Sequence, residues 1–154
     1  MWQKLLALLM VFWLGMQWSA GYVVAPLLFQ TLPKVTAGQL AGSLFHIVSY
    51  VGLFTCALLW LSLRQQVRHR VWNLALGRVL LLLLLLLAVN EWVISPVIAA
   101  HKAQTSHWLL TLLGGSFGAW HGVSAAVYLL ISLLGVWLAW RTLTVQLSQR
   151  WYDY

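Results

Sequence analysis

The chain has 154 residues, of which 62% are hydrophobic and only 7% are charged, and its mean hydropathy is +0.86. A water-soluble domain carries about 25% charged residues, because its surface must face solvent. The composition therefore excludes a soluble globular domain and indicates an integral membrane protein in contact with the lipid bilayer. The net charge of +7 does not indicate a nucleic-acid partner, because the cations are spread over apolar segments and form no basic face.

The apolar length suffices for four membrane-spanning helices, since a hydrocarbon layer of about 30 Å needs about 20 apolar residues per helix. We predict an all-α, four-helix transmembrane bundle that forms a single domain over residues 1–154, with no internal repeat. The predicted spans cover about residues 5–29, 37–63, 79–100 and 109–140.

Three local features qualify these spans. Pro26 lies near the end of the first span, where a proline is tolerated. The leucine run 80–87 in the third span is expected to face lipid. The fourth span is longer than needed, and Gly114 and Gly115 near its start predict that its first turns are bent or lie in the interface.

The distribution of Lys and Arg predicts the orientation, because these residues are enriched in cytoplasmic loops. The loops on the other side contain only Lys34 and Lys102. We therefore expect both termini in the cytoplasm, an up-down-up-down bundle and, as the location, a bacterial inner membrane. The positive charges on the predicted cytoplasmic side are Lys4, Arg64, Arg68, Arg70, Arg78, Arg141 and Arg150.

Small residues at a spacing of four predict helix-packing faces, because close packing at small residues drives helix association in lipid. In the second span these residues are Gly38 and Gly42. Both sets are expected to pack within the bundle, with formation of a homo-oligomer or contact with a membrane-protein partner as the alternative. The stripe in the fourth span consists of Gly114, Gly118, Gly122 and Ala126.

Three ionisable side chains lie inside the predicted spans, where such groups are costly and usually functional. At 1.5 Å per residue, His46 and Glu91 lie about 14 Å from the outer ends of their spans and His121 lies about 18 Å from its own. The three side chains are therefore expected in one layer of the outer half. Further candidates that share this layer are Ser124, Asn90 and Tyr50.

Three chemistries fit this layer. His46 and His121, with Glu91, could ligate haem iron or a transition metal. A carboxyl with a histidine could instead relay protons or bind a cationic substrate in a small transporter. The polar groups could also serve only helix packing in an accessory, assembly or scaffold subunit. Cys56 is expected to be a small buried hydrophobe, and the sequence contains no arrangement typical of a hydrolase or a thiol redox enzyme.

Several segments resemble the family of small membrane proteins that are similar to transmembrane protein 205. The first half contains Ala25-Pro26-Leu27-Leu28-Phe29, Leu32-Pro33 and Ala37-Gly38, followed by Gly42, Leu44 and Phe45. The second half contains Asn90, Trp92 and Pro96, then Phe117-Gly118-Ala119-Trp120-His121-Gly122-Val123-Ser124.

The resemblance implies a four-helix membrane domain without a settled activity. It places Pro26, Asn90, Pro96, His121 and Ser124 on family positions, whereas His46 and Glu91 depart from the family pattern. The architecture is also distantly similar to families that include copper-resistance membrane subunits and a haem-binding protoporphyrinogen oxidase. The sequence thus favours a small membrane protein with a polar site that binds a metal ion, haem or a proton, and it does not favour an enzyme.

Overall fold

The computed structural model describes residues 2–66 and 72–150, and this part of the chain is helical with no strand. Arg68 and Arg70, which the charge distribution placed on the cytoplasmic side, lie outside the described residues. The helical elements are α1 (Trp2–Trp18), η1 (Ser19–Val24), α2 (Ala25–Thr31), α3 (Lys34–Gln66), α4 (Trp72–Val89), η2 (Asn90–Ile94), α5 (Ser95–Ala103), α6 (Trp108–Leu113) and α7 (Phe117–Arg150).

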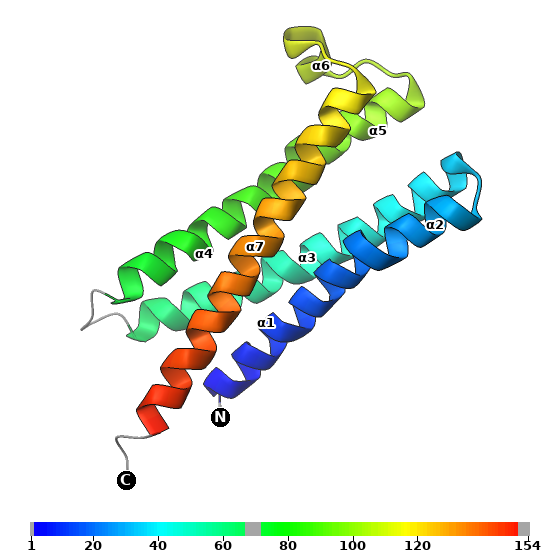
Figure 1. Ribbon diagram of the computed structural model, residues 1–154. Helices are drawn as coiled ribbons and strands as arrows, with labels where there is room; N and C mark the ends of the chain where they lie inside the picture. The colour runs from blue at the N-terminus through cyan, green and yellow to red at the C-terminus, as the bar shows by residue number, and fades with distance from the viewer. Residues whose placement is uncertain (1, 67–71, 151–154) are drawn as a thin grey trace.

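These elements form four helices that are long and apolar enough to cross a membrane, which confirms the predicted all-α transmembrane fold. Helix α1 packs on α3 and α7, and α4 also packs on α3 and α7, so the long helices form a ring (Figure 1). We call the end of the bundle with Arg64, Arg78 and Arg141 the arginine end. The opposite end, with Lys34 and Lys102, is called the lysine end.

The first and third spans are each interrupted by a π-helical turn that ends two residues before a proline. The N–H of Ala25 donates to the carbonyl of Ala20, and the N–H of Ser95 donates to the carbonyl of Asn90, five residues back in each case. A proline lacks an N–H and its ring clashes with the preceding turn of an α-helix. Widening one turn before Pro26 and Pro96 lets each helix continue to the lysine end.

The first and third spans also repeat each other at an offset of 70 residues, contrary to the prediction of no repeat. In each, a long α-helix is followed by a π-helical turn, a proline and a short α-helix. Trp2 corresponds to Trp72 and Pro26 to Pro96. The buried positions match as well: Leu6 with Leu76, Met10 with Leu80, Trp13 with Leu83, Gln17 with Leu87, and Ala20 with Asn90. Because few of these pairs are identical residues, the repeat is visible in the structure rather than in the sequence.

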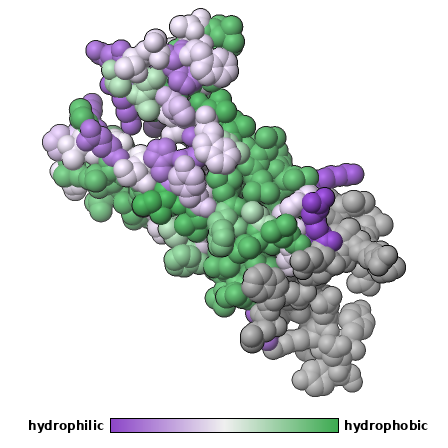
Figure 2. All heavy atoms as spheres, turned by 180° about the vertical axis from the view of Figure 1, so that it is seen from behind, coloured by the Kyte–Doolittle hydropathy of each residue, from purple (hydrophilic) through white to green (hydrophobic). Residues whose placement is uncertain are grey.

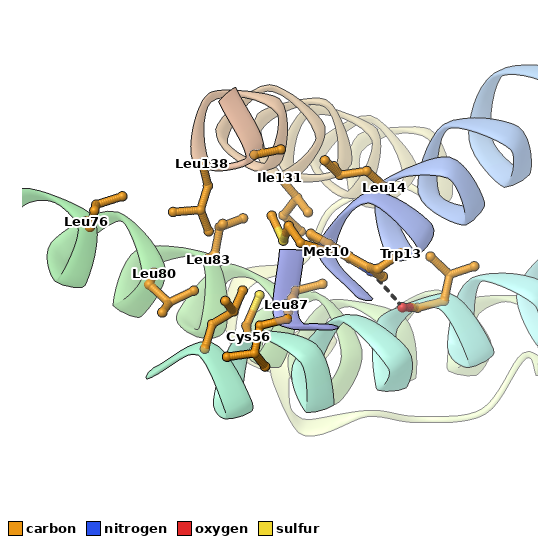
Figure 3. Close-up of a cluster of buried hydrophobic side chains, with 14 of the residues drawn as sticks. Met10, Trp13, Leu14, Cys56, Leu76, Leu80, Leu83, Leu87, Ile131 and Leu138 are labelled. Atoms are coloured by element: carbon orange, nitrogen blue, oxygen red, sulfur yellow. Dashed lines mark hydrogen bonds between the residues drawn. The ribbon is translucent and has the colours of Figure 1, made fainter. Parts of the chain in front are cut away.

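The apolar core fills the arginine-end half of the ring (Figure 3). Leu80, Leu83 and Leu87 are at most 1% exposed, so the expectation that the whole leucine run faces lipid is wrong. Leucines three and four positions apart lie on one face of a helix, and here that face points into the core. Cys56 is fully buried in the same core, as predicted.

At the lysine end the two halves of the ring diverge. Helix α2 packs on α3, whereas α5 packs on α7 (Figure 1). Figure 2 shows hydrophilic side chains gathered at this end, where the surface is notched between two lobes. The predicted fourth span is divided as the glycines suggested: α6 ends at Leu113, Gly114 and Gly115 have positive φ, and α7 begins at Phe117.

Candidate functional site

His46 and Glu91 form a contact between two spans. The Nδ1 atom of His46 on α3 is in hydrogen-bonding contact with Oε1 of Glu91 on η2, at the level of the π-helical turn. The Glu91 side chain is 4% exposed, whereas the His46 side chain is 48% exposed. A buried carboxyl is thus linked to the surface through an imidazole, and the two residues are called the His–Glu pair below.

The π-helical turn explains why two consecutive polar residues face inward. Asn90 and Glu91 are both buried, while Trp92 is exposed. The Oγ of Ser124 on α7 donates to Oδ1 of Asn90 at 3.0 Å. The wide turn therefore directs Glu91 to α3 and Asn90 to α7, which joins three of the four spans at one level.

His121 does not join this pair. It lies four residues after the start of α7 at Phe117, about 6 Å along the helix. His46 lies twelve residues after Lys34, and Glu91 twelve residues before Ala103, so both are about 18 Å from their helix ends. The expected common layer depended on a fourth span that began at 109, which the break before α7 removes.

The side chain of His121 is exposed, and its ring stacks on Phe117 with 5.8 Å between ring centroids. Tyr50 is 53% exposed and is not part of the His–Glu pair. Within residues 2–66 and 72–150, no three His, Cys, Asp or Glu side chains form a group that could hold a metal ion. The structure thus brings together only two of the three residues for which metal or haem ligation was predicted.

The two sets of small residues differ in their surroundings. Gly38 is buried and faces Lys102, whose Nζ donates to the Gly38 carbonyl at 3.3 Å. Gly42 is half-buried, with open space beside it. In the fourth-span stripe, Gly114 lies in the break before α7, so the four residues do not share one helix. All four residues of this stripe are exposed, so they do not form a packing face within the bundle: Gly114, Gly118, Gly122 and Ala126.

A second interhelical contact was not predicted from the sequence, because it depends on a glycine. The Tyr128 hydroxyl on α7 donates to the backbone carbonyl of Gln17 on α1. A Cβ atom at Gly21 would clash with the Tyr128 ring, so only glycine allows this approach. Gly21 occupies the position in η1 that Glu91 occupies in η2. At this level of the bundle, the first span makes an aromatic contact with α7, whereas the third span forms the His–Glu pair with α3.

Further polar side chains are buried that the sequence reasoning did not select. Gln17 is 1% exposed, and its Nε2 atom has no hydrogen-bond partner. The signal that could have revealed it is its spacing of four and seven residues from Trp13 and Met10, which places it on the buried face of α1. Thr55, Ser62 and Ser132 are also buried.

The fold and the site together define a small all-helical integral membrane protein with an intramembrane histidine–carboxyl contact. A family model described as "Domain of unknown function (DUF4149)" matches residues 8–107, which is more than half of the chain, and the chain belongs to this family. The matched segment includes both members of the His–Glu pair and ends before α7. No curated protein and no solved structure matches the chain significantly.

Proposed function

We propose that the protein is a proton-binding membrane protein in which the His–Glu pair takes up and releases a proton toward the lysine end. The single observation that carries the proposal is the contact between a buried Glu91 and a half-exposed His46. Histidine ordinarily changes charge near neutral pH, and an ionisable group inside the membrane is by default functional. His46 would pass the proton between the exposed surface and the buried carboxyl.

Proton binding fits the pair better than metal or haem binding. The pair offers one imidazole and one carboxylate, whereas metal sites in proteins usually use at least three protein ligands. His121, the residue expected to supply a further ligand, lies near the end of α7 and stacks on Phe117.

The orientation supports uptake from outside the cell. We propose that the arginine end, which carries most of the positive charges, faces the cytoplasm of a bacterial inner membrane, because Lys and Arg are enriched on the cytoplasmic side. The buried side chains at that end are mainly apolar, apart from a few such as Thr55 and Ser132, which favours access to the pair from the lysine end. The geometry therefore favours proton binding from the outer side, as in a sensor or the outward-facing state of a small transporter.

The test is infrared spectroscopy of the purified protein in lipid nanodiscs while the pH is changed. The chain has only two acidic side chains, so the carbonyl band of a protonated Glu91 can be identified as the band that Glu91→Gln removes. We expect this band to respond to pH in the wild type and to respond differently in His46→Gln. The matched control is Ser124→Ala, which removes the neighbouring hydrogen bond to Asn90 and leaves the pair intact. A Glu91 band that is identical in the wild type and in His46→Gln at every pH contradicts the proposal.

A structural role is the second candidate, because polar contacts join the spans at several other places. The Nε1 atom of Trp13 donates to the Val48 carbonyl at 3.1 Å, and Asn90 accepts from Ser124. In this case the chain is an accessory or assembly subunit, and the exposed side of α7 is available to a second copy or a partner. If the role of the pair is structural, His46→Gln lowers the stability of the fold and leaves the protonation of Glu91 unchanged. We also propose that the chain is related to the proteins similar to transmembrane protein 205 and that it forms a single domain over residues 1–154.

A further inference from the structure

The repeat of the first and third spans extends to the long helices that follow them. Helix α3 begins at Lys34 and α7 begins at Phe117, an offset of 83 residues. Near the middle of the two helices, the buried positions correspond at this offset, and two of the pairs are identical residues. These pairs are Val48 with Ile131, Ser49 with Ser132, Gly52 with Gly135, Thr55 with Leu138, and Cys56 with Ala139. The bundle therefore consists of two similar helical hairpins, the first hairpin (residues 2–66) and the second hairpin (residues 72–150).

The two hairpins are joined differently at the two ends of the bundle. In the arginine-end half, α1 packs on α7 and α3 packs on α4, so each hairpin contacts the other through the apolar core. At the lysine end, α2 packs on α3 and α5 packs on α7, so each hairpin packs mainly on itself (Figure 1). The lysine-end halves of the hairpins are called the two lobes below. The lobes begin at the π-helical turns, which are places where helices commonly bend.

Polar contacts link the two lobes. His46 of the first hairpin contacts Glu91 of the second, and the Nζ atom of Lys102 donates to the Gly38 carbonyl. Eight residues separate Gly38 from His46, so the ammonium contacts α3 about 12 Å along the helix from the pair. The Tyr128 hydroxyl joins α7 to α1 at the boundary with the core. Of these links, the His–Glu pair contains the side chain that ordinarily changes charge near neutral pH.

The other titratable groups of the lysine-end half do not contact the pair. Helices α1, α2 and α4 contribute none in this half. Within residues 2–66 and 72–150, no hydrogen bond or ion pair joins the pair to another titratable side chain. Lysine and tyrosine ordinarily keep one charge state near neutral pH, and the remaining histidines of the spans both contact Phe117 within the second hairpin. The groups in question are Lys34 and Tyr50 on α3, Tyr22 on η1, Tyr128 and His121 on α7, and His101 and Lys102 on α5.

We propose that the two lobes separate when the His–Glu pair loses its proton and close when it regains it, an inference that rests on the proposed function. While the pair holds the proton, the imidazolium balances the carboxylate across the two hairpins. When the proton leaves, a carboxylate that is 4% exposed has no positive partner, which is costly in a low-dielectric interior. Separation of the lobes lets water reach the carboxylate. Loss of the proton therefore favours the open form, and opening favours loss of the proton. Rocking of one repeat against another is a common motion in membrane proteins built from repeats.

The test measures distances between pairs of spin labels by pulsed electron paramagnetic resonance, on the full chain in lipid nanodiscs. Cys56→Ala removes the native thiol. Labels at Val35→Cys and Ala119→Cys, both exposed at the lysine end, report on the lobes, and labels at Leu61→Cys and Val136→Cys report on the arginine-end half. Between about pH 5 and about pH 8, where histidine ordinarily loses its charge, we expect the lysine-end distance to shift to longer values. The arginine-end distance is expected to stay constant.

Two substitutions in the pair are expected to abolish the shift. Glu91→Gln removes the buried negative charge, and His46→Gln removes the group that balances it. The matched control is Ser124→Ala, which removes a polar contact that lies within the second hairpin and is expected to keep the shift. His121→Gln is the control for the other histidines, because it removes a titratable group that stacks on Phe117 rather than on the first hairpin, and it is also expected to keep the shift.

A lysine-end distance that is the same at both pH values overturns the proposal, and so does a shift that persists in Glu91→Gln. Equal shifts at the two ends of the bundle also overturn it, because the whole bundle would then loosen rather than open at one end. The infrared band of Glu91 separates this proposal from the proposed function. A band that responds to pH without a change in distance keeps the proposed function and contradicts the opening of the lobes. A band that does not respond to pH contradicts the proposed function and, with it, the coupling of the lobes to the proton.

Discussion

At the arginine end the four spans meet through leucines and Trp13, whereas at the lysine end they diverge and meet through polar side chains (Figures 1 and 3). The boundary between the two regions lies at the π-helical turns η1 and η2. Close packing stabilises helix association in lipid. Polar groups inside the membrane are energetically costly, so those that occur there are usually functional. The arginine-end half therefore stabilises the bundle, and the lysine-end half carries the candidate site.

The largest effect on stability is expected from Trp13→Ala. Trp13 is fully buried and its indole N–H donates to the Val48 carbonyl, so the substitution leaves a cavity and removes a hydrogen bond. We expect a loss of about 3 kcal/mol in the free energy of unfolding, measured by reversible denaturation in lipid–detergent bicelles. The adjacent Phe12→Ala is the control, because Phe12 is 64% exposed. Equal losses for the two variants would mean that the arginine-end core does not provide the stability.

A smaller loss is expected from Gly21→Ala at the boundary between the regions. The added methyl group meets the Tyr128 ring and must displace it from its contact with α1. Overpacking of this kind costs about 1–3 kcal/mol, which the same denaturation experiment measures. Gly15→Ala adds the same methyl group in open space on α1 and is expected to cause no loss. If the two alanine variants are equally stable, the close approach at Gly21 does not constrain the fold.

The His–Glu pair is expected to contribute less to stability than the core. A double-mutant cycle of His46→Gln and Glu91→Gln should give a coupling energy of about 1 kcal/mol, because polar contacts within membranes are individually modest. Unfolding of the two single variants, the double variant and the wild type provides the measurement. A coupling energy of several kcal/mol would instead assign the pair to the structural framework.

The smallest effect is expected from Ser124→Ala, which removes the hydrogen bond to Asn90. We expect a loss of about 0.6 kcal/mol in the same denaturation assay, the average for interhelical hydrogen bonds in a membrane protein. A loss as large as that of Trp13→Ala would place the lysine-end half among the stabilising parts and remove the distinction between the two regions.

The membrane fold could be predicted from the sequence because composition and the lengths of apolar segments are sufficient for that purpose. The burial of Leu80, Leu83 and Leu87 could not, because a run of identical leucines has no polar face to mark its orientation. The division of the fourth span was indicated by Gly114 and Gly115, but its consequence for His121 depended on where α7 begins.

The His–Glu pair was predicted in part, since both residues were selected as ionisable groups at one depth. Their contact depends on the π-helical turn that directs Asn90 and Glu91 inward together, and Pro96 alone did not predict that turn. The contact of Tyr128 with α1 could not be anticipated, because it depends on the missing side chain of Gly21 rather than on a residue with chemistry of its own.

The most direct test of the proposed function is nitrogen NMR of histidine-labelled protein in nanodiscs over a range of pH. Glu91→Gln is expected to change the pH dependence of the His46 imidazole signals and to leave those of His121 unchanged, since His46 contacts the carboxyl and His121 does not. The two histidines are assigned by substituting each with glutamine in turn. A pH dependence of His46 that is the same in the wild type and in Glu91→Gln would contradict the claim that the two residues share a proton.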